Sequence, residues 1–254
     1  MHIIFFDIDG TLATGKTVPE SAKKAVNKLR KNGDLVFLCT GRNINYVRSN
    51  FSEYADGFIC NNGRLAWFNG EVIFDAPIGH ETRKTITERL DEAEAAYVFY
   101  GKTHGFWDGP DGLYDLLSAG FDPGYLIRGF DENVDEFYNF DIFFYDSDHY
   151  ERIRQGLEGL CIFNPHGPHP SADVTVIGTD KGDAIRAVAD KLNVDIADTY
   201  AFGDGINDIF MMKAAGHGIA MGNALDSCKE AADYITSHID DDGIYNGLKH
   251  YKLI

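Results

Sequence analysis

Two aspartates that follow a short apolar segment are the residues of this chain best suited to chemistry. The segment Ile3-Ile4-Phe5-Phe6 has no alternation, which predicts a strand buried on both faces, and Asp7 and Asp9 come directly after it. Ligands of open α/β sheets bind beyond the carboxyl ends of the strands. Two carboxylates held this close repel each other unless a cation or a shared proton intervenes. The pair therefore indicates metal-dependent carboxylate chemistry.

Three further polar side chains, Thr40, Asn62 and Asp204, also lie just past predicted core strands. Because a parallel sheet brings such strand ends to one edge, we expect these side chains to lie near the aspartate pair. Thr40 and Gly41 can offer a hydroxyl and an unhindered backbone N–H to an oxyanion. The edge would then combine acidic groups with anion-binding groups.

Lys181 and the segment from Gly203 to Asp208 add to this set. Lys181 stands at the start of a predicted helix, where its charge and the helix N–H groups jointly favour an anion. The segment reads Gly-Asp-Gly-Ile-Asn-Asp, so Asn207 and Asp208 follow Asp204 closely. Three acids or amides therefore lie within five residues of this segment.

These residue types fit one reaction. Mg²⁺ prefers oxygen ligands and is typically held by carboxylates together with a substrate phosphate. One carboxylate can attack phosphorus and form an aspartyl-phosphate, while a second carboxyl protonates the leaving oxygen and later deprotonates the attacking water. Lysine and hydroxyl donors can hold the non-bridging oxygens, where electrostatic positioning supplies most of the rate gain.

The composition narrows the class of partner. The chain has 254 residues, a hydrophobic content of 44% and a formal net charge of -17. This length predicts one or two domains with a sizeable core. The negative charge argues against nucleic acid and anionic membrane as partners, since both require basic patches. A small anionic substrate stays compatible, because a bound divalent metal can reverse the local field.

Cysteine spacing and the N-terminus bear on the compartment. The four cysteines are widely separated and form no CxxC pair, which disfavours a disulfide framework or a zinc site. No signal-peptide pattern and no long apolar segment is visible, so we expect a cytoplasmic protein. Monomer and homodimer both stay open.

The first and last thirds of the chain alternate strand and helix patterns. Apolar residues at helical spacing follow Pro19, which we place at the first helical position, and Gly33 ends that pattern. Short apolar runs before Thr40 and Asn62 complete a βαβαβ rhythm, which predicts a parallel sheet. The same rhythm returns after Gly178, so the two thirds should form one sheet.

The middle of the chain, residues 80–178, reads differently. It is richer in aromatic residues, Gly and Pro, with a predicted helix near residues 81–95 and strand-like segments at residues 97–100, 140–145, 160–163 and 174–177. We expect an inserted α+β domain with some antiparallel pairing. The predicted domain bounds are 1–79 and 179–254 for the sheet domain and 80–178 for the insert.

Four motifs in order give the chain a recognisable pattern. They are Asp7-Ile-Asp-Gly-Thr11, Thr40-Gly-Arg42, Lys181-Gly182 and Gly203-Asp-Gly-Ile-Asn-Asp208, supported by Asn62-Gly63 and Asp242-Gly243-Ile244. The chain resembles the haloacid dehalogenase-like hydrolase superfamily, and within it the Cof-like phosphatases of subclass IIB. The resemblance implies an α/β fold: a Rossmann-like parallel-sheet core with an inserted α+β cap domain of C2 type that determines substrate specificity.

The resemblance also implies a role for each motif residue. Asp7 would be the nucleophile and Asp9 the general acid and base of a phosphatase acting on a small phosphorylated metabolite such as a sugar phosphate. Mg²⁺ would be held by Asp7, the Asp9 backbone carbonyl and Asp204, with Asp208 in support. The phosphoryl group would be held by Thr40, Gly41 and Lys181, with Arg42, Asn62 and Asn207 beside it or the leaving group. Residues 11–17 would include a flexible flap.

Two residues depart from the pattern of the family. Arg64 stands where a small residue often follows Asn-Gly, which puts the shape of the pocket in doubt. Asp180 adds a negative charge directly before Lys181.

Structural roles remain open for several of these residues. The two aspartates could cap a turn, Thr40 could cap the next helix, Lys181 could be a solvated surface group, and Asp208 could merely support its loop. Aromatic and polar residues of the insert could line a sugar-sized pocket or form its core: Phe99, Tyr100, His104, Phe106, Trp107 and Asp108.

Two other functions also stay open. A phosphohexomutase-type phosphotransferase would return the phosphoryl group to its substrate, and a phospho-ligand sensor would bind without turnover. No dedicated second phosphate-binding arginine cluster stands out in the insert, which disfavours the mutase. All four motifs are intact, which disfavours the sensor.

Overall fold

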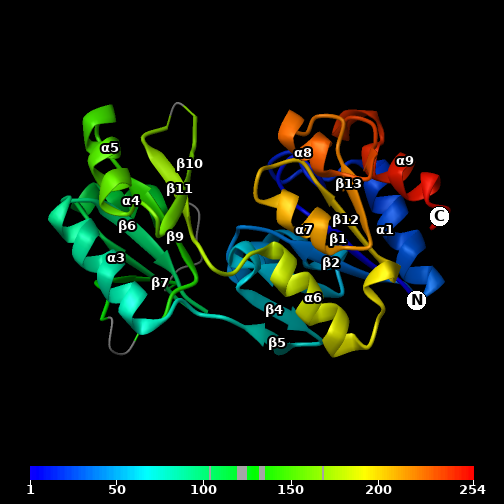
Figure 1. Cartoon of the computed structure of the whole chain (residues 1–254), viewed down its shortest axis with the longest axis horizontal. Coiled ribbons are helices and arrows are strands. Elements are labelled where there is room, and N and C mark those ends of the chain that lie inside the picture. Colours follow the sequence, from blue (N-terminus) through cyan, green and yellow to red (C-terminus); the bar gives the residue numbers. More distant parts are fainter. Residues whose placement is uncertain (103, 119–124, 132–134, 168) are drawn as a thin grey trace. The chain divides into compact units, whose positions relative to one another are not determined.

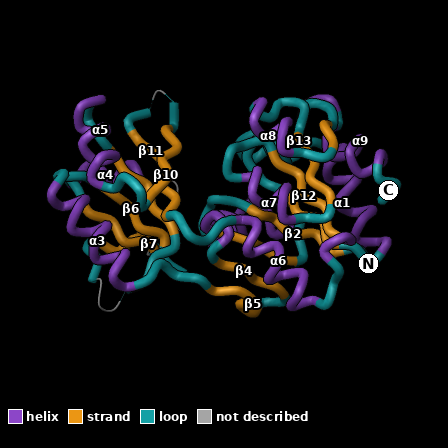
Figure 2. The backbone as a smooth tube through the Cα atoms, viewed as in Figure 1, coloured by secondary structure: helices purple, strands orange, loops and turns teal. Residues whose placement is uncertain are grey.

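The computed structural model describes residues 1–102, 104–118, 125–131, 135–167 and 169–254 (Figure 1). The chain divides into two compact units, which we call the core unit (Met1–Asp75 with Asp180–Ile254) and the cap unit (Ala76–Thr179). Strands form one sheet in each unit, and helices pack against it (Figure 2). Every helix among the described residues is too short or too polar to traverse a lipid bilayer.

The core unit is an α/β fold around one sheet of eight described strands, in the order β14-β13-β12-β1-β2-β3-β4-β5. Its first part contains β1 (Ile3–Phe6), α1 (Glu20–Asn32), β2 (Leu35–Cys39), α2 (Ile44–Phe51), β3 (Gly57–Cys60), β4 (Leu65–Phe68) and β5 (Glu71–Asp75). Its second part contains α6 (Lys181–Leu192), β12 (Thr199–Gly203), α7 (Asp208–Ala214), β13 (His217–Ala220), α8 (Asp226–Ala231), β14 (Tyr234–Ile235) and α9 (Gly243–His250).

Strand β1 lies in the interior of this sheet, paired in parallel with β2 on one side and β12 on the other. All four of its residues are fully buried, as the unbroken apolar run predicts. Ile4 and Phe6 join the core cluster that includes α1 and α9, whereas Ile3 and Phe5 join the cluster that includes α6. The parallel strands extend from β14 to β3, which confirms the predicted sheet and places the ends of β1 and β12 side by side.

The cap unit is an α+β fold, as predicted for the insert. Its described strands form one sheet in the order β10-β11-β9-β6-β7-β8, antiparallel except for the β7–β8 pair. The elements are α3 (His80–Glu92), β6 (Ala96–Tyr100), β7 (Gly105–Asp108), α4 (Asp111–Ser118), β8 (Leu126–Arg128), β9 (Asn139–Phe143), α5 (Ser147–Gly156), β10 (Cys161–Pro165) and β11 (Ser171–Val176).

From the sequence alone, several aromatic residues of the insert could line a pocket or form its core. Phe99, Tyr100, Phe106 and Trp107 are buried in the packing of the cap unit. Phe99 and Phe106 belong to the cluster that includes α3 and α5, and Phe99 stacks on Phe137 with ring centroids 4.1 Å apart. Tyr100 and Trp107 belong to the cluster on the α4 side. His104 and Asp108 are exposed.

In the cap unit, β7, α4, β8 and α5 were not predicted from the sequence. Two further differences lie in the core unit. Pro19 is the N-cap of α1 rather than its first helical residue, because its ψ of 145° is extended and Glu20 begins the helix. The β4–β5 hairpin, which the sequence reading did not predict, extends the sheet beyond β3 in antiparallel fashion. Its turn is Asn69-Gly70, and both residues have positive φ values of 52° and 82°.

Asp180 caps the helix that presents Lys181. Its side chain accepts hydrogen bonds from the backbone N–H groups of Gly182 and Asp183, and Asp183 completes a capping box. The negative charge that departs from the family pattern therefore lies at the positive end of the α6 dipole, where it is stabilising.

We expect Asp180→Ala to lower the free energy of unfolding by about 1 kcal/mol, because two N–H groups of the first turn lose their acceptor. Urea denaturation measures this change. Asp190→Ala removes an equal charge from an exposed position of the same helix and is the matched control. Equal stability losses in the two variants would contradict the capping role.

Candidate active site

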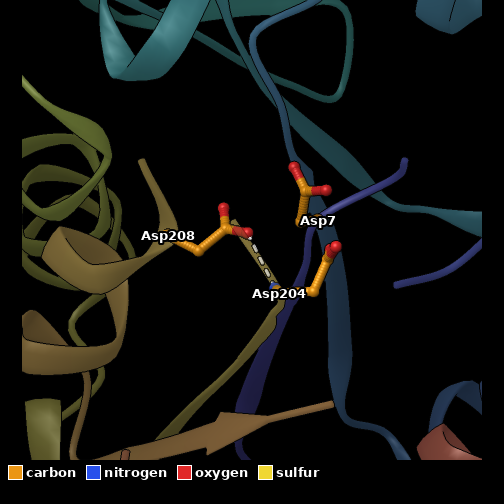
Figure 3. A group of neighbouring side chains, drawn as sticks. All are labelled: Asp7, Asp204 and Asp208. Atoms are coloured by element: carbon orange, nitrogen blue, oxygen red, sulfur yellow. Dashed lines mark hydrogen bonds between the residues drawn. The ribbon is translucent and has the colours of Figure 1, made fainter. Parts of the chain in front are cut away.

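Three carboxylates meet beyond the carboxyl ends of β1 and β12 (Figure 3). Asp7 follows β1, Asp204 follows β12, and Asp208 begins α7. Each can offer one oxygen atom such that all three oxygens lie within 4.8 Å of one another. Such a set of carboxylate oxygens has the chemistry that Mg²⁺ prefers in proteins.

Backbone and hydroxyl contacts hold two of these aspartates in place. The Asp7 N–H donates to the Phe202 carbonyl at 2.9 Å, which continues the β1–β12 pairing past the end of the strand. The Thr11 hydroxyl donates to Asp204 at 2.8 Å. Gly10 lies so close that a Cβ there would approach a carboxylate oxygen of Asp204 within 2.4 Å, and its φ is 86°. Only glycine fits this position, which explains its place in the motif.

Asp208 both supports its loop and faces the other acids. One of its oxygens accepts from the backbone N–H groups of Asp204 and Gly205, each at 2.9 Å (Figure 3 draws the first). Its other oxygen accepts from Lys181 at 2.6 Å. Asp208 therefore supports its loop and at the same time contacts the lysine that lies among the acids.

Lys181 lies between two of the acids. Its Nζ donates to Asp7 at 2.7 Å and to Asp208 at 2.6 Å, and its side chain is 1% exposed. It is therefore not a solvated surface lysine. Burial alone would lower the pKa of this amine, but Asp208 and Asp7 outweigh that effect and hold the pKa above its ordinary value.

The pKa values of two of these acids, Asp7 and Asp204, are raised. Burial, followed by the charge of Asp208, raises the pKa of Asp7 well above its ordinary value against the opposing effect of Lys181. Burial raises the pKa of Asp204 to about 6, although the hydrogen bond from Thr11 opposes the shift. A divalent cation among these oxygens would relieve the repulsion and favour the charged carboxylates.

The carboxylate of Asp9 takes part in a different contact. Its oxygens accept from the Arg42 guanidinium at 3.0 and 3.4 Å, and both side chains are about half exposed. The Asp9 carboxylate is therefore accessible to solvent and lies next to a cation, whereas Asp7 is buried. Two aspartates of one motif thus have different surroundings, which is the condition for different chemical roles.

Thr40 lies past the end of β2 and is 1% exposed. Its N–H donates to the Ile59 carbonyl at 2.9 Å, and its hydroxyl accepts from the Arg42 N–H at 3.2 Å. The N-cap of the next helix is Asn43, whose side chain accepts from the Tyr46 N–H. Thr40 is therefore not the cap of α2.

Asn62 and Asn207 join the loops that follow β3 and β12. The Asn207 amide donates to the Asn62 side-chain oxygen at 3.0 Å. Asn62 also lies against Gly41, where a Cβ would approach that oxygen within 2.9 Å. The turn that delivers Asn62 is left-handed at Asn61, Asn62 and Gly63, with φ values of 53°, 53° and 92°. The side chain of Arg64, which follows this turn, is buried.

The contacts of two positioning residues were not predicted from the sequence. Thr11 belongs to the first motif, but its hydrogen bond to Asp204 joins positions 193 residues apart. Asn223 donates to the Gly10 carbonyl at 2.8 Å and accepts from the Ile239 N–H at 3.0 Å, so it ties the aspartate loop to a distant turn. No local sequence pattern marks Asn223, because both of its contacts are remote in the chain.

Comparisons with known proteins find similarity over almost the whole chain. A family model described as haloacid dehalogenase-like hydrolase matches residues 4–248. YkrA of Bacillus subtilis strain 168, provisionally named a phosphatase, is 33% identical over 99% of this chain and 98% of its own length. The 5-amino-6-(5-phospho-D-ribitylamino)uracil phosphatase YcsE of the same strain is 28% identical over 100% of this chain and 96% of its own length. A solved structure of the subclass IIB sugar phosphatase BT4131 aligns with a TM-score of 0.82 at 27% identity, with all of both chains covered.

A parallel sheet with acidic groups and a buried lysine beyond its carboxyl edge, together with an inserted α+β unit, defines a class of hydrolases. The chain belongs to the haloacid dehalogenase-like hydrolase family. Within that family it is a phosphatase of the Cof-like group, subclass IIB.

Proposed function

We propose that this phosphatase is Mg²⁺-dependent and hydrolyses a small phosphate monoester through an aspartyl-phosphate on Asp7. The observation that carries the proposal is the contact of buried Lys181 with Asp7 and Asp208, beside Asp204. A cation held against the nucleophile at this depth can bind phosphoryl oxygens, and the neighbouring acids can bind a metal.

In the first step, an oxygen of Asp7 attacks phosphorus and the ester P–O bond breaks. Asp9 gives its proton to the leaving oxygen. In the second step, water attacks phosphorus of the phosphorylated Asp7, Asp9 takes the proton from that water, and phosphate leaves with the Asp7 carboxylate restored. The exposed position of Asp9 supports its proton-transfer role, because the leaving group and water approach from the open side.

The remaining motif residues would bind and orient the phosphoryl group. We assign its non-bridging oxygens to Thr40, Gly41 and Lys181, and the neighbourhood of the phosphate or leaving group to Arg42, Asn62 and Asn207. Mg²⁺ would be held by Asp7, the backbone carbonyl of Asp9 and Asp204, with Asp208 in support, and when bound it would neutralise charge on the phosphoryl oxygens. The oxygen-only set of donors fits this ion.

The relatives support a small phosphorylated metabolite as the substrate class. Their names include a sugar phosphatase and a 5-amino-6-(5-phospho-D-ribitylamino)uracil phosphatase. We assign much of the choice of leaving group to the cap unit, residues 76–179, as the inserted domain of this subclass.

A metabolite panel tests the proposal directly. Sugar phosphates, pyridoxal phosphate, nucleotides and phosphoglycolate are incubated with the protein and Mg²⁺, and released phosphate is measured. We expect release from at least one small monoester, and its loss when EDTA removes Mg²⁺. An isomerised sugar phosphate in place of free phosphate would show a phosphotransferase instead.

Because the pKa of Asp204 is raised, we expect the stabilisation of the folded protein by Mg²⁺ to depend on pH. Because the folded-state pKa of about 6 lies above the ordinary value of 3.8, the folded protein holds this proton more tightly than the unfolded chain. Without metal, that stabilisation is complete below about pH 4 and is lost as the pH rises through 6. Mg²⁺ requires the deprotonated form, so its stabilising effect should grow over the same range.

Thermal unfolding with and without Mg²⁺ at about pH 5 and about pH 7.5 measures this effect. Without metal, we expect wild-type stability relative to Asp204→Asn to fall by about 1–2 kcal/mol between these pH values, since partial exposure screens the interaction. With Mg²⁺ the wild type should gain more at the higher pH, and the variant should gain little at either. Equal Mg²⁺ effects on both proteins would exclude Asp204 as a ligand.

A further inference from the structure

The segment that follows Asp9 carries a lysine at its tip. Thr14 and Thr17 pair through two backbone hydrogen bonds, of 3.0 and 3.1 Å, and form a tight turn. Gly15 takes the left-handed conformation that this turn requires, with a φ of 61°, and Lys16 completes it. A bridge between Asp9 and Ala13 fixes the base of the segment beside the candidate acid.

The ring of Tyr46 lies near two cations. Lys16 Nζ is 6.0 Å from the ring centroid, and the Arg42 guanidinium carbon is 5.1 Å from it. Tyr46 is in the first turn of α2, where the Asn43 cap fixes its backbone, and its ring packs against Phe51. The partly buried ring of Tyr46 therefore lies near two cations, Lys16 of the turn and Arg42 of the Thr40-Gly41-Arg42 motif.

The electrostatics of this group favour an anion. Like charges near one ring repel each other, and the carboxylate of the half-exposed Asp9 contacts Arg42. The chain as a whole has a net charge of -17, so two cations near one ring are a local exception. The contact between Arg42 and Asp9 also limits how far the substrate's anionic group can lie from the ester oxygen, because Asp9 is the group assigned to that leaving oxygen. An anionic group on Arg42 would therefore lie only a few bonds from that oxygen.

We propose that Lys16, Arg42 and Tyr46 form an anion subsite for the leaving group, so that preferred substrates carry a carboxylate or a second phosphate close to the ester oxygen. This inference rests on the proposed function, since it defines the leaving group of the same reaction. Tyr46 acts as the platform that holds the two cations, and Lys16 reaches the substrate from the turn.

Three two-carbon esters that differ in charge test the subsite: phosphoglycolate, 2-hydroxyethyl phosphate and phosphoethanolamine. We expect kcat/KM to decrease in that order for the wild type, with an advantage of at least about tenfold for the anionic over the neutral ester. Added salt should reduce this advantage, because these side chains are reached by solvent.

Substitutions test which side chains cause the preference for the anionic ester. Lys16→Met and Tyr46→Leu should reduce the advantage of phosphoglycolate to less than about threefold, mainly through KM, while Tyr46→Phe keeps it because the ring remains. Lys28→Met, which removes a positive charge from an exposed position of α1, should keep the full advantage. Circular dichroism of each variant confirms folding.

The outcomes separate the two proposals. An equal or higher kcat/KM for the neutral ester in the wild type would overturn the subsite and leave the phosphatase mechanism intact, as would an advantage that survives Lys16→Met and Tyr46→Leu. Failure to release phosphate from these esters and from the whole metabolite panel would overturn the proposed function, and the subsite with it.

Discussion

Asp7→Asn is expected to lower kcat/KM for a generic aryl phosphate by at least about a thousandfold, because an amide cannot form the acyl phosphate of the proposed mechanism. Folding should persist. The carboxylate of Asp7 is buried among other acids, and its raised pKa shows that the negative charge is unfavourable there in the absence of metal. The uncharged amide of similar shape can still accept the hydrogen bond from Lys181.

Steady-state hydrolysis and urea denaturation without Mg²⁺ measure the two parts of this expectation. Asp226→Asn makes the same chemical change at an exposed position in the first turn of α8 and should keep wild-type kcat/KM. Near-normal turnover by Asp7→Asn would rule out Asp7 as the nucleophile.

Lys181→Met should affect both stability and activity. The substitution keeps the apolar length of the side chain but removes the ammonium group that contacts Asp7 and Asp208. Loss of one partner from a buried ion pair leaves an uncompensated charge and costs about 3–5 kcal/mol. In Mg²⁺-free buffer we expect the free energy of unfolding to fall by that amount, and Mg²⁺ to restore part of it. Activity with Mg²⁺ should fall by at least about a hundredfold, because the cation that we assign to the phosphoryl group is lost.

Urea denaturation with and without Mg²⁺, followed by kinetics under conditions where the variant is folded, separates these effects. Lys191→Met lies on the exposed surface of the same helix and is the control for loss of a positive charge from α6. A Lys181→Met protein that is folded in Mg²⁺ and retains wild-type kcat/KM would contradict the phosphoryl-binding role.

The strands of the core were predictable because their signals are local. An unbroken apolar run such as residues 3–6 is buried on both faces, and the rhythm of strands and helices fixes a parallel sheet. Helix α6 was predicted with its observed bounds from its apolar spacing. The β4–β5 hairpin was missed, although its Asn69-Gly70 turn is the dipeptide that favours a two-residue hairpin.

The surroundings of the aromatic residues in the cap unit could not be predicted from local sequence patterns. Phe99 and Phe106 are spaced as strand residues, but spacing alone does not say whether a ring lines a pocket or fills a core. The packing of α3 and α5 on one face of the sheet decides it for these two. That information lies in contacts between elements far apart in the chain.

The sequence by itself determined the kind of chemistry and the edge of the sheet where its residues gather, since residues past successive parallel strands must meet there. Only the tertiary structure decided the pairing: Lys181 with Asp7 and Asp208, Asp9 with Arg42, and Thr11 with Asp204. The physical reason is distance along the chain. Strand and helix signals arise within a few residues, whereas the partner of Lys181 at Asp7 is 174 residues away, and only the folded sheet brings the two together.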